Sequence, residues 1–308
     1  MRKKHIILLF LVIAFFQNIS DAQTFWKRNR KEYSFGAGAT NFLGDLGGAN
    51  QIGTHGIKDF NWPAVRPDFA VGYRYRTTRQ TALKTELIYA RLAGDDKYTE
   101  EPFRHNRNCN FRSPVIELSE QFQYCLVRER PHHIYNLKGV RGWRYIQMTS
   151  YLFAGASVMY FNPHGEWNGQ WYALRPLCTE GEGLVPTRRK YSLIQPVIPL
   201  GIGFKFALND KWSVGIEYGI RITFTDYIDD VSKTYFDPNL LNQEKGPVAV
   251  HFANPTNHSL PPQDGNPVNV TYPGQERGDP THKDSYMLAI ISFYYKIPKG
   301  TFTLPKYR

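Results

Sequence analysis

Alternation of apolar and polar residues recurs along most of this chain, and a period of two is typical of β-strands. In the clearest case, residues 212–223, six large apolar side chains share one face and small or polar side chains share the other. Helical periodicity is nearly absent. The pattern predicts eight strands, near residues 32–40, 66–76, 81–91, 113–125, 150–161, 196–207, 212–223 and 286–297. A tilted transmembrane strand needs about 9–11 residues, so segments of this length are able to cross a bilayer.

The connections between these strands alternate in length. Those at 77–80 and 209–210 are short, whereas those at 41–65, 92–112, 162–195 and 224–285 are long. In bacterial outer-membrane barrels the short turns face the periplasm and the long loops face outward. We therefore predict an all-β fold, a transmembrane antiparallel up-and-down β-barrel of eight strands with long extracellular loops and periplasmic termini. A soluble β-sandwich also alternates and is the alternative.

The first 22 residues have the layout of a secretory signal peptide. Basic residues at 2–4 precede an apolar run at 6–16, and Ser20 and Ala22 supply small residues before a cleavage site at Gln23. Eleven residues of helix span only about 16 Å, roughly half of a bilayer core, which argues against a membrane anchor. We expect residues 1–22 to be removed, residues 23–308 to form the barrel domain, and the protein to reside in the outer membrane.

Eight strands leave an interior only wide enough for side chains. Alternation places seven charged residues on the inner face: Arg74, Lys84, Glu86, Glu117, Lys205, Glu217 and Arg221. Because both signs are present, we expect internal ion pairs and a plugged barrel. A folded cargo protein would not pass through it.

Composition and motifs give little support to catalysis. Lys and Arg exceed Asp and Glu by 38 to 27, but the basic residues are scattered, which argues against nucleic-acid binding. The chain contains no P-loop, no H-E-x-x-H zinc motif and no G-x-S-x-G elbow. We predict a non-enzymatic protein with no cofactor and no small-molecule substrate. An outer-membrane lipid-modifying enzyme using the loop histidines His251, His258 and His282 is a minor alternative.

Acidic residues gather in the longest loop. Asp226, Asp229, Asp230 and Asp237 follow the seventh strand, and Asp279 and Asp284 precede the eighth. Converging oxygen ligands of this kind are able to hold calcium. Their spacing does not match an EF-hand, so the favoured interpretation is a set of solvated loop carboxylates and no metal site.

Three cysteines are too few for a disulfide scaffold. The topology places Cys109 and Cys178 in outer loops, where one disulfide between them would fit an exported protein. Cys125, at the periplasmic end of the fourth strand, is then an odd thiol. One hypothesis is a link from Cys125 to a periplasmic partner, and the alternative is a packed or lipid-facing free thiol.

One connection on the periplasmic side is long. Residues 126–149 are rich in basic side chains and contain a single acidic one, Glu129. Basic groups without nearby counter-charges suit recognition of an acidic surface. The candidate contacts for a periplasmic partner are Cys125, Arg128, Arg130, Lys138, Arg141 and Arg144. The alternative is a solvated hairpin below the membrane.

Three loop-and-strand pieces resemble the PorG family of Bacteroidota outer-membrane proteins. They are F-G-A-G-A followed by N-F-L-G-D-L at 35–46, T-D-Y-I-D-D-V-S at 225–232 with Thr234-Tyr235, and R-G-D-P at 277–280 with K-D-S-Y at 283–286. The resemblance implies an accessory barrel of the type IX secretion system, which in many species also supports gliding. It implies that the barrel anchors a periplasmic ring, formed by a lipoprotein and its partner, to the outer membrane. No site residue transfers, and the Pro- and Asn-rich loop 237–285 departs from the pattern. A surface-exposed structural or adhesive barrel without a secretion role is the alternative.

Overall fold

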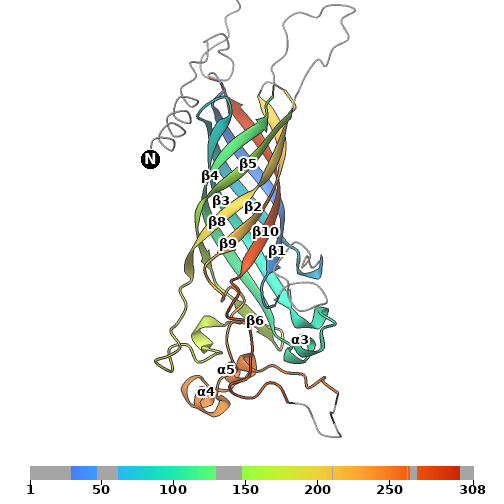
Figure 1. Ribbon diagram of the computed structural model, residues 1–308, viewed down its shortest axis with the longest axis vertical. Coiled ribbons are helices and arrows are strands. Elements are labelled where there is room, and N and C mark those ends of the chain that lie inside the picture. The colour runs from blue at the N-terminus through green and yellow to red at the C-terminus, as the bar shows by residue number, and fades with distance from the viewer. Residues whose placement is uncertain are drawn as a thin grey trace, which may run out of the picture.

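The computed structural model describes residues 29–46, 62–129, 148–209, 211–261, 263 and 269–298. Eight long strands form a closed antiparallel barrel (Figure 1). These strands are β1 (Lys31–Leu43), β2 (Arg66–Arg76), β3 (Thr81–Asp95), β4 (Asn110–Val127), β5 (Met148–Phe161), β8 (Ile194–Ala207), β9 (Trp212–Thr223) and β10 (Ser285–Ile297). Each pairs with its neighbours in the chain, β1 pairs with β10, and β3–β4 pairing completes the ring. The predicted fold class is confirmed, and the sandwich alternative is excluded.

The barrel wall is apolar outside and polar inside. Along β9, for example, Ile216 and Tyr218 are exposed, whereas Glu217 and Arg221 are buried. The same alternation exposes Phe35 on β1 and Leu118 on β4. This inverts the usual arrangement of a soluble protein and matches the hydrocarbon core of a bilayer, which accepts strands only when every backbone group is paired in a closed ring. None of the helices in the described residues is long and apolar enough to cross a membrane.

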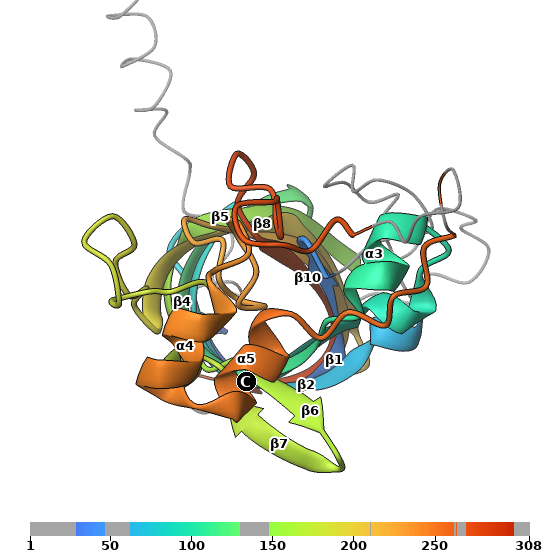
Figure 2. The ribbon, with the colours of Figure 1, turned by 90° about the horizontal axis from the view of Figure 1, so that it is seen from below.

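The two ends of the barrel differ. The end that holds the short turns 77–80 and 208–211 also holds the start of β1 and the end of β10. At the opposite end, β3 and β4 run on past their predicted ranges and stay paired as far as Asp95 and Asn110. Beyond them lie a hairpin, β6 (His164–Trp167) with β7 (Gln170–Ala173), and the helices α3 (Pro102–Arg107), α4 (Pro238–Lys245) and α5 (Pro247–Ala253). We call this end, formed by residues 44–46, 96–109, 162–193 and the described part of 224–284, the outer cap (Figure 2).

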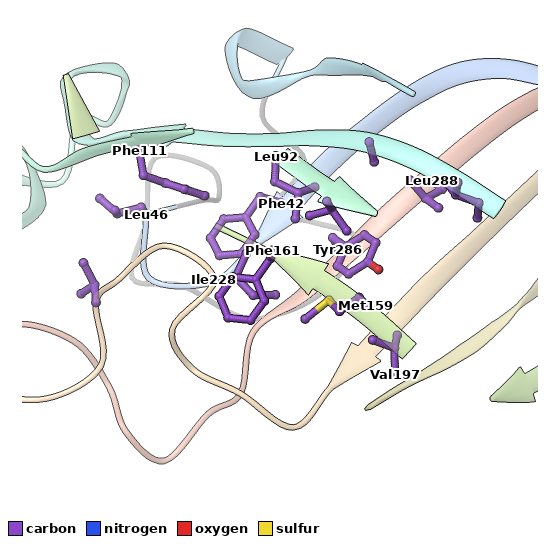
Figure 3. Close-up of a cluster of buried hydrophobic side chains, with 14 of the residues drawn as sticks. Phe42, Leu46, Leu92, Phe111, Met159, Phe161, Val197, Ile228, Tyr286 and Leu288 are labelled. Atoms are coloured by element: carbon purple, nitrogen blue, oxygen red, sulfur yellow. The ribbon is translucent and has the colours of Figure 1, made fainter. Parts of the chain in front are cut away.

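Most of the buried apolar side chains lie where the outer cap meets the barrel mouth. Phe42, Phe111, Phe161, Ile228 and Tyr286 pack in one cluster, although they come from four strands and a loop (Figure 3). The rings of Phe42 and Phe111 meet edge to face, with centroids 4.8 Å apart. The cap is therefore fixed to the barrel by a conventional hydrophobic core rather than only by its connections.

Candidate functional site

The interior of the barrel is filled by charged and aromatic side chains. The seven charged residues assigned to the inner face by alternation are all buried, with at most 4% of each exposed. They form three groups along the barrel.

The first group, nearest the chain termini, centres on Glu32. Its carboxylate accepts hydrogen bonds from Lys205 Nζ at 2.7 Å and from Arg74 Nη1 at 3.0 Å, and Arg76 Nη2 lies 3.7 Å away. Glu32 was missed by the sequence analysis, although it is in phase with the inward residues Ser34 and Gly36. Three cations thus depend on one carboxylate that has almost no contact with solvent.

The second group centres on Glu217. Lys84 Nζ donates to it at 2.7 Å, and the hydroxyls of Tyr151 and Tyr294 donate at 2.5 and 3.0 Å. Lys84 also pairs with Glu86 at 2.7 Å. Tyr294 follows the exposed Phe293 on β10, and its own side chain is buried inside the barrel. The partners lie on different strands, so this group ties the walls together across the lumen.

The third group lies below the outer mouth. Glu117 accepts hydrogen bonds from Tyr286 at 2.9 Å and from Arg221 Nε at 3.4 Å. The apolar cluster of Figure 3 follows directly above, since it shares Tyr286. Ion-paired groups at three levels, with an apolar core over the last, leave a barrel built to be closed rather than to conduct cargo.

The outer cap brings together the three segments that carry the family resemblance. The backbone N–H of Leu46 donates to Asp229 at 3.0 Å, that of Ile228 donates to Asp284 at 2.8 Å, and that of Asp279 donates to Asp45 at 3.0 Å. The carboxylates therefore tie loops from distant parts of the chain to one another. Their structural use explains why acidic residues occur at these positions.

A buried guanidinium joins the cap loops from another side. Arg277 donates to Glu180 at 2.9 Å and to the carbonyl oxygen of Asp230 at 2.6 Å. Glu180 in turn accepts the backbone N–H groups of Ser232 and Lys233. The pairing of Glu180 with Arg277 was not predicted from sequence. The two residues are 97 positions apart in loops, where no repeating pattern indicates which side chains meet.

Burial raises the pKa of several cap carboxyls. The pKa of Asp45 rises to about 6 and that of Asp226 to about 7, in both cases mainly because burial disfavours the charged form. Burial, with Asp229 and Asp226 nearby, raises the pKa of Asp284 well above its usual range. The cap thus holds carboxyl groups that keep their proton to a higher pH than an exposed carboxyl does.

The calcium interpretation gains no support from this geometry. No group of three or more metal-binding side chains in the described residues is arranged to hold a metal ion. Asp237 instead caps α4 by accepting the N–H of Asn239, and Asp279 contacts His282 on the surface. The prediction that these loop carboxylates are solvated is wrong for four of them. Asp226, Asp229, Asp230 and Asp284 are buried.

The contacts of His282 and His251 in the structure have structural explanations. Nδ1 of His282 lies 2.7 Å from Asp279 Oδ2 and 3.0 Å from Thr281 Oγ1, so acid and hydroxyl meet the same ring nitrogen. A relay requires the two groups on different nitrogens. His251 stacks on Trp167, with ring centroids 4.3 Å apart.

The three cysteines are all buried free thiols. In place of the predicted disulfide, Cys109 lies beside Arg277, whereas the sulfur of Cys178 faces the carbonyl groups of Arg175 and Pro176. Cys125 points into the barrel and packs against Tyr151, with its sulfur 3.9 Å from Arg74. This position contradicts the hypothesis of a covalent link to a partner, because inward alternation hides the thiol, and it fits the alternative of a packed thiol.

At the end with the short turns, Arg128 is exposed just past β4. Glu129, the only acidic residue of the segment 126–149, is paired with Lys296 on β10 at 2.8 Å. Arg130, Lys138, Arg141 and Arg144 lie outside the described residues, as does the predicted signal peptide. The one acidic side chain of this segment is therefore engaged with the barrel.

A single carboxylate interrupts the lipid-facing wall. Glu120 on β4 is exposed between Leu118 and Phe122, and it accepts a hydrogen bond from Thr85 Oγ1 on β3 at 2.5 Å. Glu120 is not among the inward charges predicted above, because alternation along β4 places its side chain on the outer face.

Replacement of Glu120 by leucine is expected to stabilise the barrel by roughly 1 kcal/mol, because an acidic side chain on the lipid face is unfavourable. Urea unfolding in lipid vesicles measures the change. Glu244→Leu on the exposed face of α4 is the control and should have little effect. A loss of stability in Glu120→Leu would contradict this account.

A family model described as "Domain of unknown function (DUF6089)" matches residues 4–240. No curated protein matches the chain. Among solved structures, Ail, the attachment invasion locus protein of Yersinia pestis, is 9% identical with a TM-score of 0.37, covering 87% of this chain and 99% of its own. Neisserial surface protein A is 8% identical with a TM-score of 0.36, covering 86% and 96%. A major outer-membrane protein of Thermus thermophilus is 11% identical with a TM-score of 0.34, covering 86% and 99%. Similarity at this level does not transfer function between barrels.

Proposed function

The chain belongs to the DUF6089 family, whose model matches most of its length, and we propose a function for it. We propose that it is a non-enzymatic outer-membrane scaffold of the type IX secretion machinery that anchors a periplasmic ring. The resemblance of its loop motifs to PorG proteins supports the choice of system. The filled lumen carries the argument for a scaffold, because ion pairs across the barrel at three levels leave no conduit. In this proposal residues 1–22 are a cleaved signal peptide that directs export.

The periplasmic contact is assigned to the basic segment 126–149. Its candidate contacts are now Arg128, Arg130, Lys138, Arg141 and Arg144, without Cys125. The pairing of Glu129 with Lys296 supports this assignment, since no acid of the segment is left to neutralise it. A partner with an acidic face would gain complementary electrostatics there.

Replacing Arg128, Arg130, Arg141 and Arg144 by serine is expected to leave the barrel folded and to reduce recovery of the ring lipoprotein about tenfold or more. Four charges facing an acidic partner are lost, and charge pairs of this kind govern association. Affinity purification of the tagged chain from detergent-solubilised outer membranes, with mass spectrometry of the co-purified proteins, measures recovery. Heat-modifiable gel migration reports barrel folding, and secretion of several cargo proteins should fall together.

The matched control removes four positive charges from the other end, by serine at Arg189, Lys190, Lys245 and Lys283. It should retain the lipoprotein. Equal recovery from both variants would remove the docking role of the segment. A wild-type barrel that purifies without partners, in cells whose secretion survives deletion of the chain, would remove the scaffold proposal itself.

The second candidate is a surface-exposed structural or adhesive barrel. The outer cap favours it, because a packed core and buried Arg277 hold the long loops in one shape. A shaped cap is suited to display a surface. Normal secretion in a deletion strain, with altered surface attachment, would select this function.

A further inference from the structure

The outside of the barrel carries a concentrated basic site where the apolar wall ends. On β3 the outward-facing residues run from Leu87 through Tyr89 to Arg91, and on β4 they run from Leu118 through Ile116 to Arg112. The register pairs Arg91 with Pro114 and Arg112 with Ala93, so the two arginines lie on adjacent strands. Arg91 comes next after Tyr89 on the outward face of β3, and Arg112 comes one outward position beyond Pro114 on β4, at the level where headgroups would surround the outer end.

A cavity of about 290 Å³ lies at this position, between β3, β4 and the β6–β7 hairpin. Four basic side chains line it, Arg66, Arg91, Lys97 and Arg112, against two acidic ones, Asp95 and Glu166. Asp95 is already paired with Lys97 at 2.6 Å. Within the part of the chain that the structure describes, no ion pair engages the other three basic groups, so the cavity has a surplus of positive charge.

The hairpin positions one of these groups. The Arg112 guanidinium lies over the ring of Trp171 on β7, 3.7 Å from its centroid, and this cation–π contact holds it at the cavity. β6 is joined to β4 next to this residue, by the pairing of Arg112 with His164. Among the described residues, the Arg91 side chain makes a long contact to Tyr89, with Nε 3.5 Å from the hydroxyl oxygen. Two guanidinium groups that line one cavity are suited to a phosphate, which each can bind through two N–H groups.

We propose that this cavity binds the phosphate of a phosphorylated lipid in the leaflet around the outer end of the barrel. The anion would sit between Arg91 and Arg112, and the acyl chains would lie along Leu87, Ile116 and Leu118. A lipid is favoured over other anions because the basic groups lie in line with lipid-facing side chains, Leu87 and Tyr89 on β3 and Leu118 and Ile116 on β4. The site is at the opposite end from segment 126–149, so it adds to the scaffold function and does not depend on it.

The purified full-length chain in detergent is titrated with bisphosphorylated lipid A, and bound lipid is counted by native mass spectrometry. The double variant Arg91→Gln with Arg112→Gln is expected to bind about ten- to thirty-fold more weakly, because basic groups near a membrane surface each add several-fold to the binding of anionic lipid. The control, Arg189→Gln with Lys211→Gln, loses the same charge at exposed positions away from the cavity and should bind normally. Heat-modifiable migration confirms that both variants are folded.

Two further probes separate the sources of the phosphate. Dephosphorylated lipid A should bind as weakly to the native chain as bisphosphorylated lipid A binds to the double variant, and millimolar inorganic phosphate should not displace the bound lipid. Equal binding of phosphorylated and dephosphorylated lipid would overturn the proposal in favour of apolar contact only. Displacement by inorganic phosphate would overturn it in favour of a free-anion site.

Discussion

Replacing Glu32 by alanine is expected to destabilise the barrel by about 3–5 kcal/mol, the usual result of removing one partner from a buried ion pair. Lys205 and Arg74 would lose their shared acceptor, which lies 2.7 and 3.0 Å from them. Together with Arg76, they would then form a group of three neighbouring cations that has lost its carboxylate. Water does not compensate easily, because Glu32 and Lys205 are each only 1% exposed. Urea-induced unfolding in lipid vesicles, followed by tryptophan fluorescence, measures the loss.

A second substitution separates loss of the ion pair from loss of packing. Adding Lys205→Met to Glu32→Ala removes one of the stranded cations and should recover part of the stability, so the two changes are not additive. Glu244→Ala, on the exposed face of α4, should change the free energy of unfolding by less than about 0.5 kcal/mol. Simple additivity of Glu32→Ala and Lys205→Met would show that the pair does not act as a unit.

The barrel was predictable from sequence because one rule decides both its fold and its interior. Successive strand residues face opposite sides, so the phase of Ile216 also fixes the phase of Glu217 and Arg221. The alternation along β1 also places Glu32 inside the barrel. It was missed because it lies at the very start of the strand, where few alternating residues precede it. Sequence alone says which residues face inward; it does not say that Glu217 meets Lys84 on the far wall.

The outer cap was not predictable in the same way. Its contacts join residues such as Glu180 and Arg277, or Leu46 and Asp229, whose separation carries no period. Cysteine pairing failed for a related reason, since loop membership places Cys109 and Cys178 on the same side of a membrane without bringing their sulfurs together. The same limit applied to the acidic loop residues, where composition indicated solvated side chains and the fold buried them.

Those buried carboxyls predict that the outer cap is less stable at pH 8 than at pH 5. Burial raises the pKa of Asp45 to about 6 and that of Asp226 to about 7; burial, with Asp230 and Glu180 nearby, raises the pKa of Glu182 to about 8. Between the ordinary carboxyl pKa near 4 and these values, the folded cap binds more protons than the unfolded chain. Its stability therefore falls as pH rises through this window.

Asp284→Asn tests this account most directly, because an amide keeps an oxygen that can accept the Ile228 N–H and loses the charge. Amide hydrogen exchange of the cap, corrected for the intrinsic effect of pH, should be about tenfold slower than in the native chain at pH 8, since one pKa unit corresponds to a factor of ten in the opening equilibrium. The difference should disappear as the pH falls below the ordinary carboxyl pKa near 4, because Asp284 is then protonated in the folded and the unfolded chain alike. Asp237→Asn, exposed at the start of α4, should change neither value, since asparagine caps a helix as well as aspartate. Faster exchange in Asp284→Asn at pH 8 would mean that the ionised carboxylate holds the cap loops together, which would reverse the sign of the pH dependence argued for the whole cluster.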